Sequence, residues 1–392
     1  MFIASEPQTK QARLSPEHEA TIKATLPLVG SKINEITPLF YQKMFAAHPE
    51  LIADTFNRGN QKQGDQQKAL AASIATFASM LVDPNAPDPV EMLARIGHKH
   101  VSLGITRDQY QIVHDHLFAA IVEVLGADVV TADVAEAWDA VYWLMANVLI
   151  DYEEALYASN DVAAGDVFRP VTVTAKRQLT DNVYEFELTS DSGALVAPRP
   201  GQYTSVGVVL PDGARQLRQY SLLTGDENRY RIAVQIDGEV STFLRDNVQV
   251  GDQIETTLAA GDLVLDESDA PVVLVSQGIG STPMVGMLEH LSTTGSRRAV
   301  TVLHADDSEQ AYAQREHVAA LVSSLADAQL VVAYRKEGDR LSIAEHLPEG
   351  AEIYLCGGNG FLQDIREQLT AATVDPARIH FELFSPNDWL VS

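Results

Sequence analysis

The spacing of apolar residues changes twice along this chain, and each change restricts what that part of the chain can fold into. Up to about residue 158, apolar residues recur at the three- and four-residue steps of a helix face, as Leu70, Ile74 and Phe77 do. From about residue 167 to residue 269 they alternate with polar residues, as in half-buried strands, for example at 184–188. Beyond residue 270, short apolar runs such as 272–275 alternate with helical segments, which indicates a parallel sheet covered on both faces.

Three domains follow from this pattern in a chain of 392 residues, which is too long for one ordinary core. We predict an all-α domain over 14–158, an antiparallel β-barrel domain over 166–269, and an α/β domain with a parallel sheet over 270–392. The small, polar stretch at 160–166 is expected to be a linker. Turns between the barrel strands are expected at Pro200-Gly201, at 211–213 and at Asp237-Gly238.

Capping residues mark several helix ends in the first part of the chain. Ser15 before Pro16 predicts a helix start, and Asp88 before Pro89 predicts another. The segment 106–109 reads Thr-Arg-Asp-Gln, a capping box for a further helix. Gly104 lies where the helix that begins near Pro89 would end.

The formal net charge is −26, and Cys356 is the only cysteine. The charge argues against broad contact with nucleic acid or an anionic membrane, since both are negatively charged, and favours a well-solvated surface. A single cysteine excludes an internal disulfide and fits a reducing compartment, and the polar N-terminus lacks an apolar secretory core. The apolar run at 140–150 is too short to span a bilayer, so we expect a buried helix and a cytoplasmic protein.

The first candidate binding segment, 276–283, reads Ser-Gln-Gly-Ile-Gly-Ser-Thr-Pro and directly follows a buried strand. Glycines at a strand-to-helix turn let backbone amides approach a pyrophosphate at the positive end of the helix. This is not the full dinucleotide fingerprint, and a purely structural turn explains the segment about equally well.

Two further segments carry groups suited to binding a cofactor. Residues 218–221 read Arg-Gln-Tyr-Ser, where the arginine can pair with a flavin phosphate while alternating side chains reach the isoalloxazine edge. Residues 354–358 read Tyr-Leu-Cys-Gly-Gly and end another buried strand, at the carboxyl edge where open sheets bind ligands.

With these segments in this order, residues 167–392 resemble the ferredoxin-NADP reductase superfamily. The resemblance implies that FAD binds the stretch 199–203, the Arg-x-Tyr-Ser segment and a phosphate turn at 238–241. It also implies that a nicotinamide nucleotide binds the glycine turn and the Cys-Gly segment. The implied FAD ligands are Tyr203, Arg218, Gln219, Tyr220, Ser221, Gly238, Val240 and Ser241. The implied nicotinamide ligands are Gly278, Ile279, Gly280, Ser281, Thr282, Pro283, Cys356 and Gly357.

The C-terminal segment belongs to the flavin site by the same resemblance. Phe384 matches the aromatic residue that covers the flavin, with a core phenylalanine at a strand end as the alternative. Glu382 is implied to lie near the flavin and to tune its potential. Leu383, Ser385 and Pro386 complete the implied set, although Leu383 and Ser385 replace a common Cys and Gly. Gly358 likewise stands where Pro is frequent, and we expect these departures to change affinity rather than role.

The coenzyme is expected to be NADH or NADPH. The strand at 300–303 leads into His304-Ala305-Asp306-Asp307, and acids at that place would repel a 2′-phosphate, which favours NADH. Arg335 and Lys336 follow a later strand and would admit NADPH.

In the helical part, polar residues interrupt the apolar faces. His100 follows Leu93 and Ile96 at helical steps, and Gln66 and Glu153 lie on other apolar stripes. Tyr110 falls in the first turn of the helix that Thr106 caps. Each has an explanation as a satisfied core residue, but together they suggest a pocket, because buried polar groups need partners or a cofactor.

These segments resemble those of the flavohaemoglobin family, and this second resemblance covers nearly the whole chain. It implies a globin domain with haem b, in which His100 is the proximal iron ligand and Phe56 wedges the haem. Tyr41, Gln66 and Leu70 would line the distal side, where O2 binds, and Lys99 would lie near the haem–flavin junction. Tyr110 and Glu153 match the proximal pair around the ligand histidine, which would make it a stronger electron donor to iron. The segment before Leu14 has no counterpart in the family pattern.

The resemblance implies nitric oxide dioxygenase activity, in which NAD(P)H reduces FAD, FAD reduces haem, and nitric oxide is oxidised to nitrate with O2. Catalytic roles would fall to Tyr110, Glu153, Tyr41 and Gln66. The alternatives are a haem-dependent peroxide or alkylhydroperoxide reductase, an NADH oxidase, and a gas-binding sensor or store that its reductase keeps ferrous. The expected partners are nitric oxide and O2, with a lipid as a further candidate ligand of the haem pocket, and without nucleic acid or an obligate protein partner.

Overall fold

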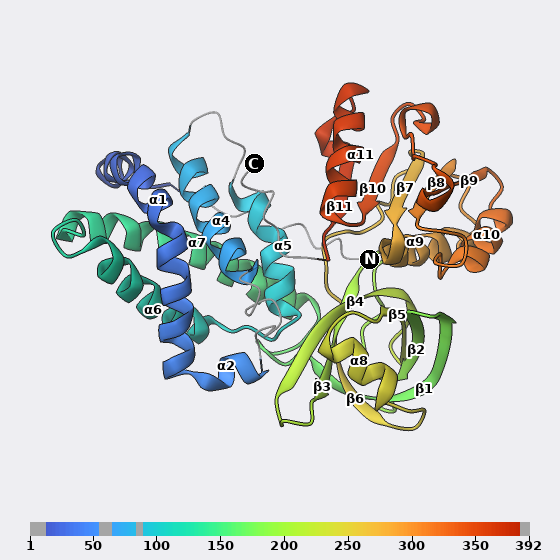
Figure 1. Cartoon of the computed structure of the whole chain (residues 1–392), viewed down its shortest axis with the longest axis horizontal. Coiled ribbons are helices and arrows are strands. Elements are labelled where there is room, and N and C mark those ends of the chain that lie inside the picture. Colours follow the sequence, from blue (N-terminus) through green and yellow to red (C-terminus); the bar gives the residue numbers. More distant parts are fainter. Residues whose placement is uncertain (1–12, 55–64, 84–88, 385–392) are drawn as a thin grey trace. The chain divides into compact units, whose positions relative to one another are not determined.

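The computed structural model describes residues 13–54, 65–83 and 89–384, and at 53–54, 65–72 and 89–92 it describes the backbone alone. The chain divides into two compact units, whose elements Figure 1 labels. The first unit holds the chain up to Phe168 together with Val209–Leu217, and the second holds Arg169–Val208 and Arg218–Ser385. The first unit is mainly helical, and the second contains most of two β-sheets.

The helical unit begins and ends its helices largely where the sequence predicts. Within the described ranges its helices are α1 (Pro16–Ala47), α2 (Pro49–Asp54), α4 (Asp65–Val82), α5 (Pro89–Val101), α6 (Arg107–Leu125) and α7 (Ala132–Ser159). Ser15 caps α1 by accepting a hydrogen bond from the backbone N–H of His18 at 3.1 Å. Before α6 the side chain of Gln109 accepts the N–H of Thr106 at 2.9 Å, as a capping box requires. Gly104, in the turn after α5, has φ +70°, a conformation that favours glycine. Asp88 lies outside the described residues.

The apolar faces of these helices meet in one core. Ile22 and Phe40 of α1, Phe77 of α4 and Val141 of α7 are almost completely buried in it. The apolar run predicted as a buried helix lies within α7, where Leu149 is also buried. Core packing of this extent, rather than helix propensity, stabilises these helices.

In the second unit, antiparallel strands close into a barrel in the order β1-β2-β5-β4-β3-β6. The strands are β1 (Phe168–Thr180), β2 (Val183–Thr189), β3 (Tyr203–Val209), β4 (Arg215–Gly225), β5 (Arg229–Gln235) and β6 (Gln253–Thr257). Alternation has the predicted meaning in β2, where Phe186 and Leu188 are buried and Glu187 is not. The expectation for Asp237-Gly238 was wrong in one respect: Gly238 precedes the helix α8 (Glu239–Asp246), so this turn leads into a helix instead of a strand.

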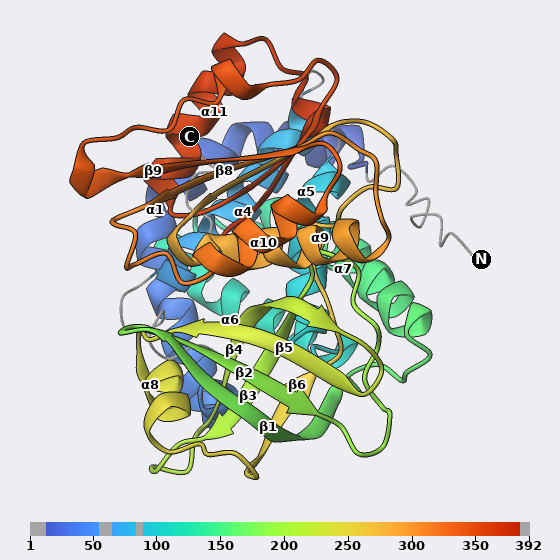
Figure 2. The ribbon, with the colours of Figure 1, turned by 90° about the vertical axis from the view of Figure 1, so that its right-hand side faces the viewer.

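The other sheet of this unit is parallel, with the strand order β11-β10-β7-β8-β9. Its strands are β7 (Val272–Gln277), β8 (Val300–Asp306), β9 (Ala328–Tyr334), β10 (Glu352–Cys356) and β11 (Ile379–Glu382). Its helices are α9 (Ser281–Thr293), α10 (Arg315–Ser324) and α11 (Asn359–Ala371), with short 3₁₀ turns η1 (Gly278–Gly280), η2 (Arg335–Glu337), η3 (Ala344–His346) and η4 (Pro376–Arg378). Leu274 packs with α9 and α10, whereas Val273 and Val275 pack with α11 on the other face (Figure 2).

The barrel and the parallel sheet share apolar packing. Leu223 and Ala233 of the barrel belong to the same buried cluster as Met284 and Met287 of α9. Gly286 permits this contact, because a Cβ there would lie 2.6 Å from the backbone oxygen of Leu222. The helix that follows the glycine turn is therefore held against the barrel.

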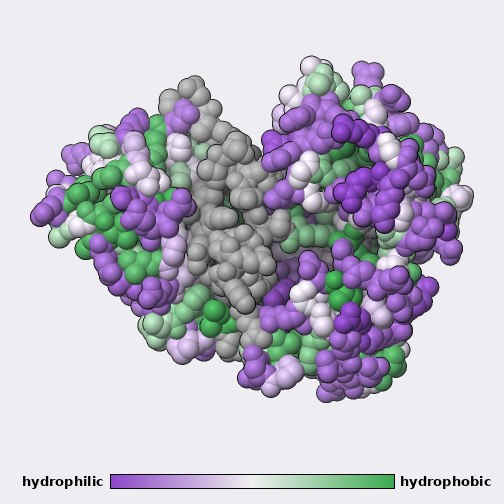
Figure 3. Space-filling view, viewed as in Figure 1, coloured by the Kyte–Doolittle hydropathy of each residue, from purple (hydrophilic) through white to green (hydrophobic). Residues whose placement is uncertain are grey.

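The predicted fold class of helical domain, antiparallel barrel and parallel-sheet domain is confirmed. The domain limits at 14–158, 166–269 and 270–392 stay a prediction. Among the described helices, none combines the length and the apolarity that crossing a bilayer would require. Hydrophilic residues cover most of the face of the barrel and sheet seen in Figure 3, in keeping with a net charge of −26.

Candidate functional site

The helical unit contains a hydrogen-bonded cluster made by three helices. His100 lies at the C-terminal end of α5, Tyr110 in the first turn of α6 and Glu153 on the buried face of α7. The Nδ1 atom of His100 is 2.8 Å from Glu153 Oε1 and 3.0 Å from Tyr110 Oη. Tyr110 Oη donates to the same carboxylate oxygen at 2.5 Å. The structure thus brings together three residues that the sequence singled out separately, and Glu153 and His100 are 53 positions apart.

The proton positions in this cluster follow from burial. Burial, and then the charge of Glu153, raise the pKa of Tyr110 far above its usual range, so the phenol keeps its proton and donates it. Glu153 is only 2% exposed, and such a carboxylate is stable only when donors surround it. If the imidazole donates its Nδ1–H to Glu153, its Nε2 atom retains a lone pair. Within the described residues no hydrogen bond reaches Nε2, so this nitrogen can serve as a ligand to a metal.

Two tyrosines of α7 support this cluster, and the sequence analysis did not assign them a role. Tyr142 Oη donates to the backbone oxygen of Tyr110 at 2.6 Å, and Tyr157 Oη donates to that of Ile105 at 2.7 Å. The Ile105 N–H in turn donates to the oxygen of His100 at 3.0 Å. The spacing of Tyr142 and Tyr157 around Glu153 on one helix face was the available signal.

The candidate distal residues are placed only in part. Tyr41 is 4% exposed on α1, with its ring 5.5 Å from that of Phe45. Gln66 and Leu70 lie on α4, but their side chains and all of Phe56 fall outside what the structure describes. Lys99 is exposed near the end of α5. The distal arrangement therefore stays a prediction.

The barrel brings two of the predicted flavin segments together. Arg218 of β4 forms an ion pair with Glu239, the first residue of α8, with 3.3 Å between Nη2 and Oε1. Gly238 before it has φ +93°, and Ser241 Oγ accepts the N–H of Asp237 at 2.8 Å, which holds the turn in shape. A cation beside a helix N-terminus is the arrangement that binds a phosphate. Glu239 was missed by the sequence analysis, since nothing local shows that it faces Arg218.

The other predicted flavin residues lie on β3 and β4. Tyr203 is nearly buried, and Tyr220 is half-buried with its pKa raised by burial. Gln219 donates from Nε2 to Ser205 Oγ at 3.1 Å, and Ser221 is buried. Val240, in the first turn of α8, is buried. Gln219 and Tyr220 are successive residues of β4, so their side chains project to opposite faces of the strand.

The two predicted nicotinamide segments meet at the carboxyl edge of the parallel sheet. A Cβ on Gly280 would lie 2.5 Å from the backbone oxygen of Cys356 and 3.0 Å from the nitrogen of Gly357. Gly278 has φ +54°, and Ile279 lies between the two glycines in the turn.

Ser281, Thr282 and Pro283 open α9 at this turn and are buried. Thr282 Oγ1 donates to the oxygen of Ile279 at 2.9 Å. Within the described residues Ser281 Oγ is buried without a hydrogen-bond partner, at the N-terminus of the helix. A buried orphan hydroxyl at a helix N-terminus fits the phosphate of a dinucleotide.

Glu382 of β11 lies opposite Cys356 of β10 in the register of these two parallel strands, and it is 9% exposed. Burial, with the charge of Glu382, raises the pKa of Cys356 well above its usual value, so this thiol is protonated and unreactive at neutral pH. Leu383 packs against the sheet core, whereas Phe384 is 51% exposed, which argues against the core alternative. Ser385 and Pro386 lie outside the described residues.

A polar cluster that the sequence analysis did not identify lies beside the glycine turn. His304, fully buried in β8, is 2.9 Å from Ser276 Oγ through Nδ1 and 3.2 Å from Asp306 Oδ2 through Nε2. Its ring stacks on Tyr312 with 3.7 Å between centroids. The polar residues at the ends of two adjacent strands were the only signal for it.

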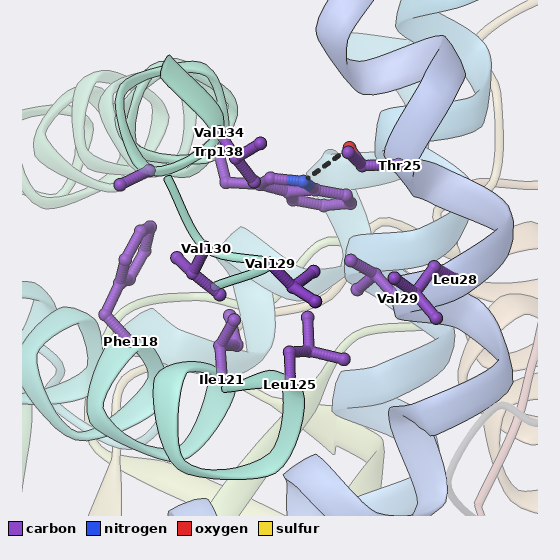
Figure 4. A pocket seen from close by; sticks show the side chains of 11 residues that line it. Thr25, Leu28, Val29, Phe118, Ile121, Leu125, Val129, Val130, Val134 and Trp138 are labelled. Atoms are coloured by element: carbon purple, nitrogen blue, oxygen red, sulfur yellow. Dashed lines mark hydrogen bonds between the residues drawn. The ribbon is translucent and has the colours of Figure 1, made fainter. Parts of the chain in front are cut away.

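An apolar pocket in the helical unit lies apart from all of these residues. Its lining includes Leu28 and Val29 of α1, Ile121 of α6 and Trp138 of α7 (Figure 4). The indole N–H of Trp138 donates to Thr25 Oγ1 at 3.0 Å. None of the predicted site residues lines this pocket.

Known proteins are similar to this chain both in its helical part and over nearly its whole length. The globin family model matches residues 39–149. A flavohemoprotein of Deinococcus radiodurans is 38% identical, with 95% of this chain and 98% of the relative covered. A flavohemoprotein of Vibrio cholerae is 38% identical, with 97% of this chain and 100% of the relative covered.

Solved structures of similar proteins superimpose on this chain as well. The flavohemoglobin of Malassezia yamatoensis, solved with bound FAD and heme, superimposes with a TM-score of 0.88 at 34% identity and covers 95% of this chain and 100% of its own. The FAD/NAD binding domain of a nitric oxide dioxygenase from Vibrio cholerae matches 56% of this chain and 99% of its own, with a TM-score of 0.52 at 34% identity.

Proposed function

This chain belongs to the flavohaemoprotein family, and we propose that it is a nitric oxide dioxygenase that uses NAD(P)H, FAD, haem b and O2. As a member of this family it is an NAD(P)H-dependent oxidoreductase. The balanced reaction converts two NO, two O2 and one NAD(P)H into two nitrate ions, NAD(P)⁺ and one proton. The observation that carries the proposal is the hydrogen-bonded cluster of His100, Tyr110 and Glu153, in which the phenol and the carboxylate are buried.

The cluster favours oxygen chemistry over simple storage. When bound, haem iron supplies O2 binding and one-electron chemistry, and FAD divides a two-electron hydride into single electrons. His100 would hold the iron through Nε2, while Glu153 and Tyr110 hold the proton on Nδ1. An imidazole that donates to an anion is a stronger electron donor, which O2 activation requires and reversible storage does not.

On the other side of the haem, Tyr41 and Gln66 would orient bound gas, with Leu70 and Phe56 shaping the pocket. Tyr41 lies in the buried face of α1, which excludes bulk water from its surroundings. Lys99 would lie near the junction with the flavin. The expected partners are nitric oxide and O2, and the haem pocket is the candidate place for a lipid.

The reductase residues would bind two cofactors at neighbouring places. Arg218 and the amides at the start of α8 would hold the flavin phosphate, and Tyr203 and Tyr220 would contact its ring system. Phe384, an exposed aromatic side chain, would cover the flavin. The turn at Gly278–Gly280 and the orphan hydroxyl of Ser281 would take the pyrophosphate of the nicotinamide nucleotide.

Further roles are proposed for residues around these two cofactors. Cys356 and Gly357 would border the nicotinamide, and Glu382 would tune the flavin potential. Gln219, Ser221, Val240 and Ser241 would shape the flavin site, and Thr282 and Pro283 the start of the nucleotide-binding helix. We place the enzyme in the cytoplasm, because a single cysteine suits a reducing compartment.

The test begins with the purified full chain. Its absorption spectrum should contain a Soret band beside the flavin bands, and a spectrum without the Soret band would exclude haem in the helical unit. Aerobic turnover with NADH should then consume nitric oxide and produce nitrate in equal amounts. If nitrate stays unformed, the dioxygenase assignment is wrong. Faster turnover on a lipid peroxide would favour the peroxidase alternative, and O2 binding with little NADH consumption would favour the gas store.

A further inference from the structure

Asp306 and Asp307 follow each other at the end of β8, but the structure gives them different surroundings. The side chain of Asp306 is 9% exposed, and that of Asp307 is 47% exposed. Only one of the two is therefore placed to meet a ligand from solvent.

Asp306 is engaged inside the protein through both carboxylate oxygens. Burial lowers the pKa of His304, so its ring is neutral at pH 7 and has one N–H to donate. A carboxylate only accepts, so the N–H belongs on Nε2, facing Asp306 at 3.2 Å, and Nδ1 accepts the hydroxyl proton of Ser276. The other oxygen of Asp306 accepts the backbone N–H of Asp307 at 2.7 Å.

Asp307 instead forms an ion pair with Arg335, the first residue of η2, with 2.7 Å between Oδ1 and Nη2. Arg335 is 77% exposed, so its guanidinium is free to turn toward another anion. The Lys336 N–H donates to the backbone oxygen of Asp307 at 3.0 Å, which joins the ends of β8 and β9.

The ion pair of Asp307 and Arg335 lies near the place where the adenosine ribose of a bound dinucleotide is expected. β7 ends in that turn and pairs with β8, with Ser276 opposite His304. In open α/β sheets a dinucleotide whose pyrophosphate lies at the glycine turn has its adenosine ribose beside the end of the next strand. The carboxylate of Asp307 and the guanidinium of Arg335 lie at that strand end, and both side chains reach solvent.

We infer that Asp307 is the residue that selects the coenzyme: it accepts from the ribose 2′-hydroxyl of NADH and keeps Arg335 from binding the 2′-phosphate of NADPH. Asp306 has a structural role, in which it anchors His304. This inference rests on the proposed function, because it assumes that a nicotinamide nucleotide reduces the flavin.

The experiment measures anaerobic flavin reduction in the full chain by NADH and by NADPH, and compares their apparent second-order rate constants. Asp307→Asn should raise the NADPH to NADH ratio at least tenfold, and the gain should shrink as salt screens the phosphate–Arg335 attraction. Adding Arg335→Ala to Asp307→Asn should remove the part of the gain that comes from faster reduction by NADPH, while the slower reduction by NADH caused by the lost carboxylate should remain. Asp327→Asn is the matched control, since it removes an equal exposed charge next to the opposite end of β9 and should leave the ratio unchanged.

Asp306→Asn separates the two acids. It should lower the thermal stability of the chain while the coenzyme ratio stays within about twofold of wild type. A ratio that moves with Asp306→Asn and not with Asp307→Asn would overturn the inference, and so would faster reduction by NADPH in Asp307→Asn that Arg335→Ala leaves undiminished. If neither coenzyme reduces the flavin of the wild-type chain, the proposed function itself fails, whereas reduction by NADH with an unmoved ratio refutes only the role of Asp307.

Discussion

The two buried acids Glu153 and Asp306 are held by different hydrogen-bond donors. Glu153 accepts from a phenol and an imidazole, and Asp306 from an imidazole and a backbone amide. Removing one partner of such a group lowers the free energy of unfolding by more than the hydrogen bond itself contributes, because the remaining charge stays buried without a partner. Substitutions at these positions therefore test function best when they preserve shape and remove only charge.

Glu153→Gln should lower nitric oxide turnover by about 10- to 100-fold, the usual loss for a residue that orients a metal-bound histidine. The amide keeps the shape of the carboxylate and removes the negative charge that makes His100 a strong donor. The measurement is nitrate formation together with the iron–histidine stretching frequency of the ferrous protein, which should fall.

Glu154→Gln is the control for this prediction. Glu154 pairs with Arg107 at the surface, with 3.1 Å between the charged groups, and is 50% exposed. Its loss should change neither turnover nor the stretching frequency. An unchanged frequency in Glu153→Gln would contradict the proposed electronic role.

Gly280→Ala should prevent reduction of the flavin by NADH, because the added methyl group would collide with the backbone of Cys356 at 2.5 Å. The shift of the turn should also cost about 1–3 kcal/mol of unfolding free energy. Gly360→Ala, in α11, has no neighbour within 4 Å and should be neutral or slightly stabilising. Equal behaviour of the two variants, measured by stopped-flow reduction and urea unfolding, would refute the proposed close approach.

Short elements depend on contacts made by their neighbours. The helix α8 has only eight residues, so its own hydrogen bonds are not enough to keep it folded. Lys176 of β1 reaches its C-terminal end and donates to the backbone oxygens of Arg245 at 2.6 Å and Val248 at 2.7 Å. A cation at this end also interacts favourably with the helix dipole. The N-terminal end of the same helix forms the proposed phosphate site.

Lys176→Met should therefore weaken FAD binding severalfold, although Lys176 touches no predicted FAD ligand. The two lost hydrogen bonds should lower the unfolding free energy by about 1–3 kcal/mol. FAD titration and thermal unfolding measure the two effects. Lys23→Met removes an exposed lysine from a surface pair with Glu19 and should affect neither. FAD affinity that stays at the wild-type value would show that α8 does not need this anchor.

At the scale of the whole molecule, long-range polar contacts fasten segments that the chain separates. Asp266 lies in the segment between the barrel and the parallel sheet. Its Oδ1 atom accepts hydrogen bonds from Arg298 Nη2 at 2.7 Å and from the hydroxyl of Tyr354 at 3.0 Å. Arg298 is 8% exposed and also donates to the backbone oxygens of Asp266 and Ala270. These contacts tie the segment that leaves the barrel to β10 and to the segment before β8.

Partial burial acts to raise the pKa of Asp266, but hydrogen bonds from Ser268 and Arg298 outweigh it and hold the pKa at about 2. The folded pKa lies below the unfolded value of 3.8, so the charged form stabilises the fold above about pH 4. This stabilisation should be lost as the pH falls from about 4 to 2. Solvent screening reduces it to about 1 kcal/mol.

Asp266→Asn should accordingly lower the urea midpoint at pH 7 and differ progressively less from wild type as the pH falls toward 2. Asp364→Asn, an exposed acid on α11, is the control, and its difference from wild type should stay small at every pH. A constant difference for Asp266→Asn across this range would contradict a charge effect.

Sequence by itself determined the elements of this protein, because periodicity and capping are local. The steps of Leu70, Ile74 and Phe77 predict α4, the alternation at 184–188 predicts β2, and the turn after β7 has the glycines its backbone needs. Residues with unusual chemistry on these elements, such as His100 and Glu153, could be found in the same way. The resemblance to known families then gave them expected roles.

Tertiary structure alone decided which of these residues meet. Glu153 lies 53 positions from His100, and Glu239 lies 21 positions from Arg218, so no local pattern reports either contact. Asp306 and Asp307 are chemically identical neighbours, and only the packing of His304 makes one structural and leaves the other exposed. The physical reason is that burial and partner choice depend on the free energy of removing a charge from water, which distant residues set.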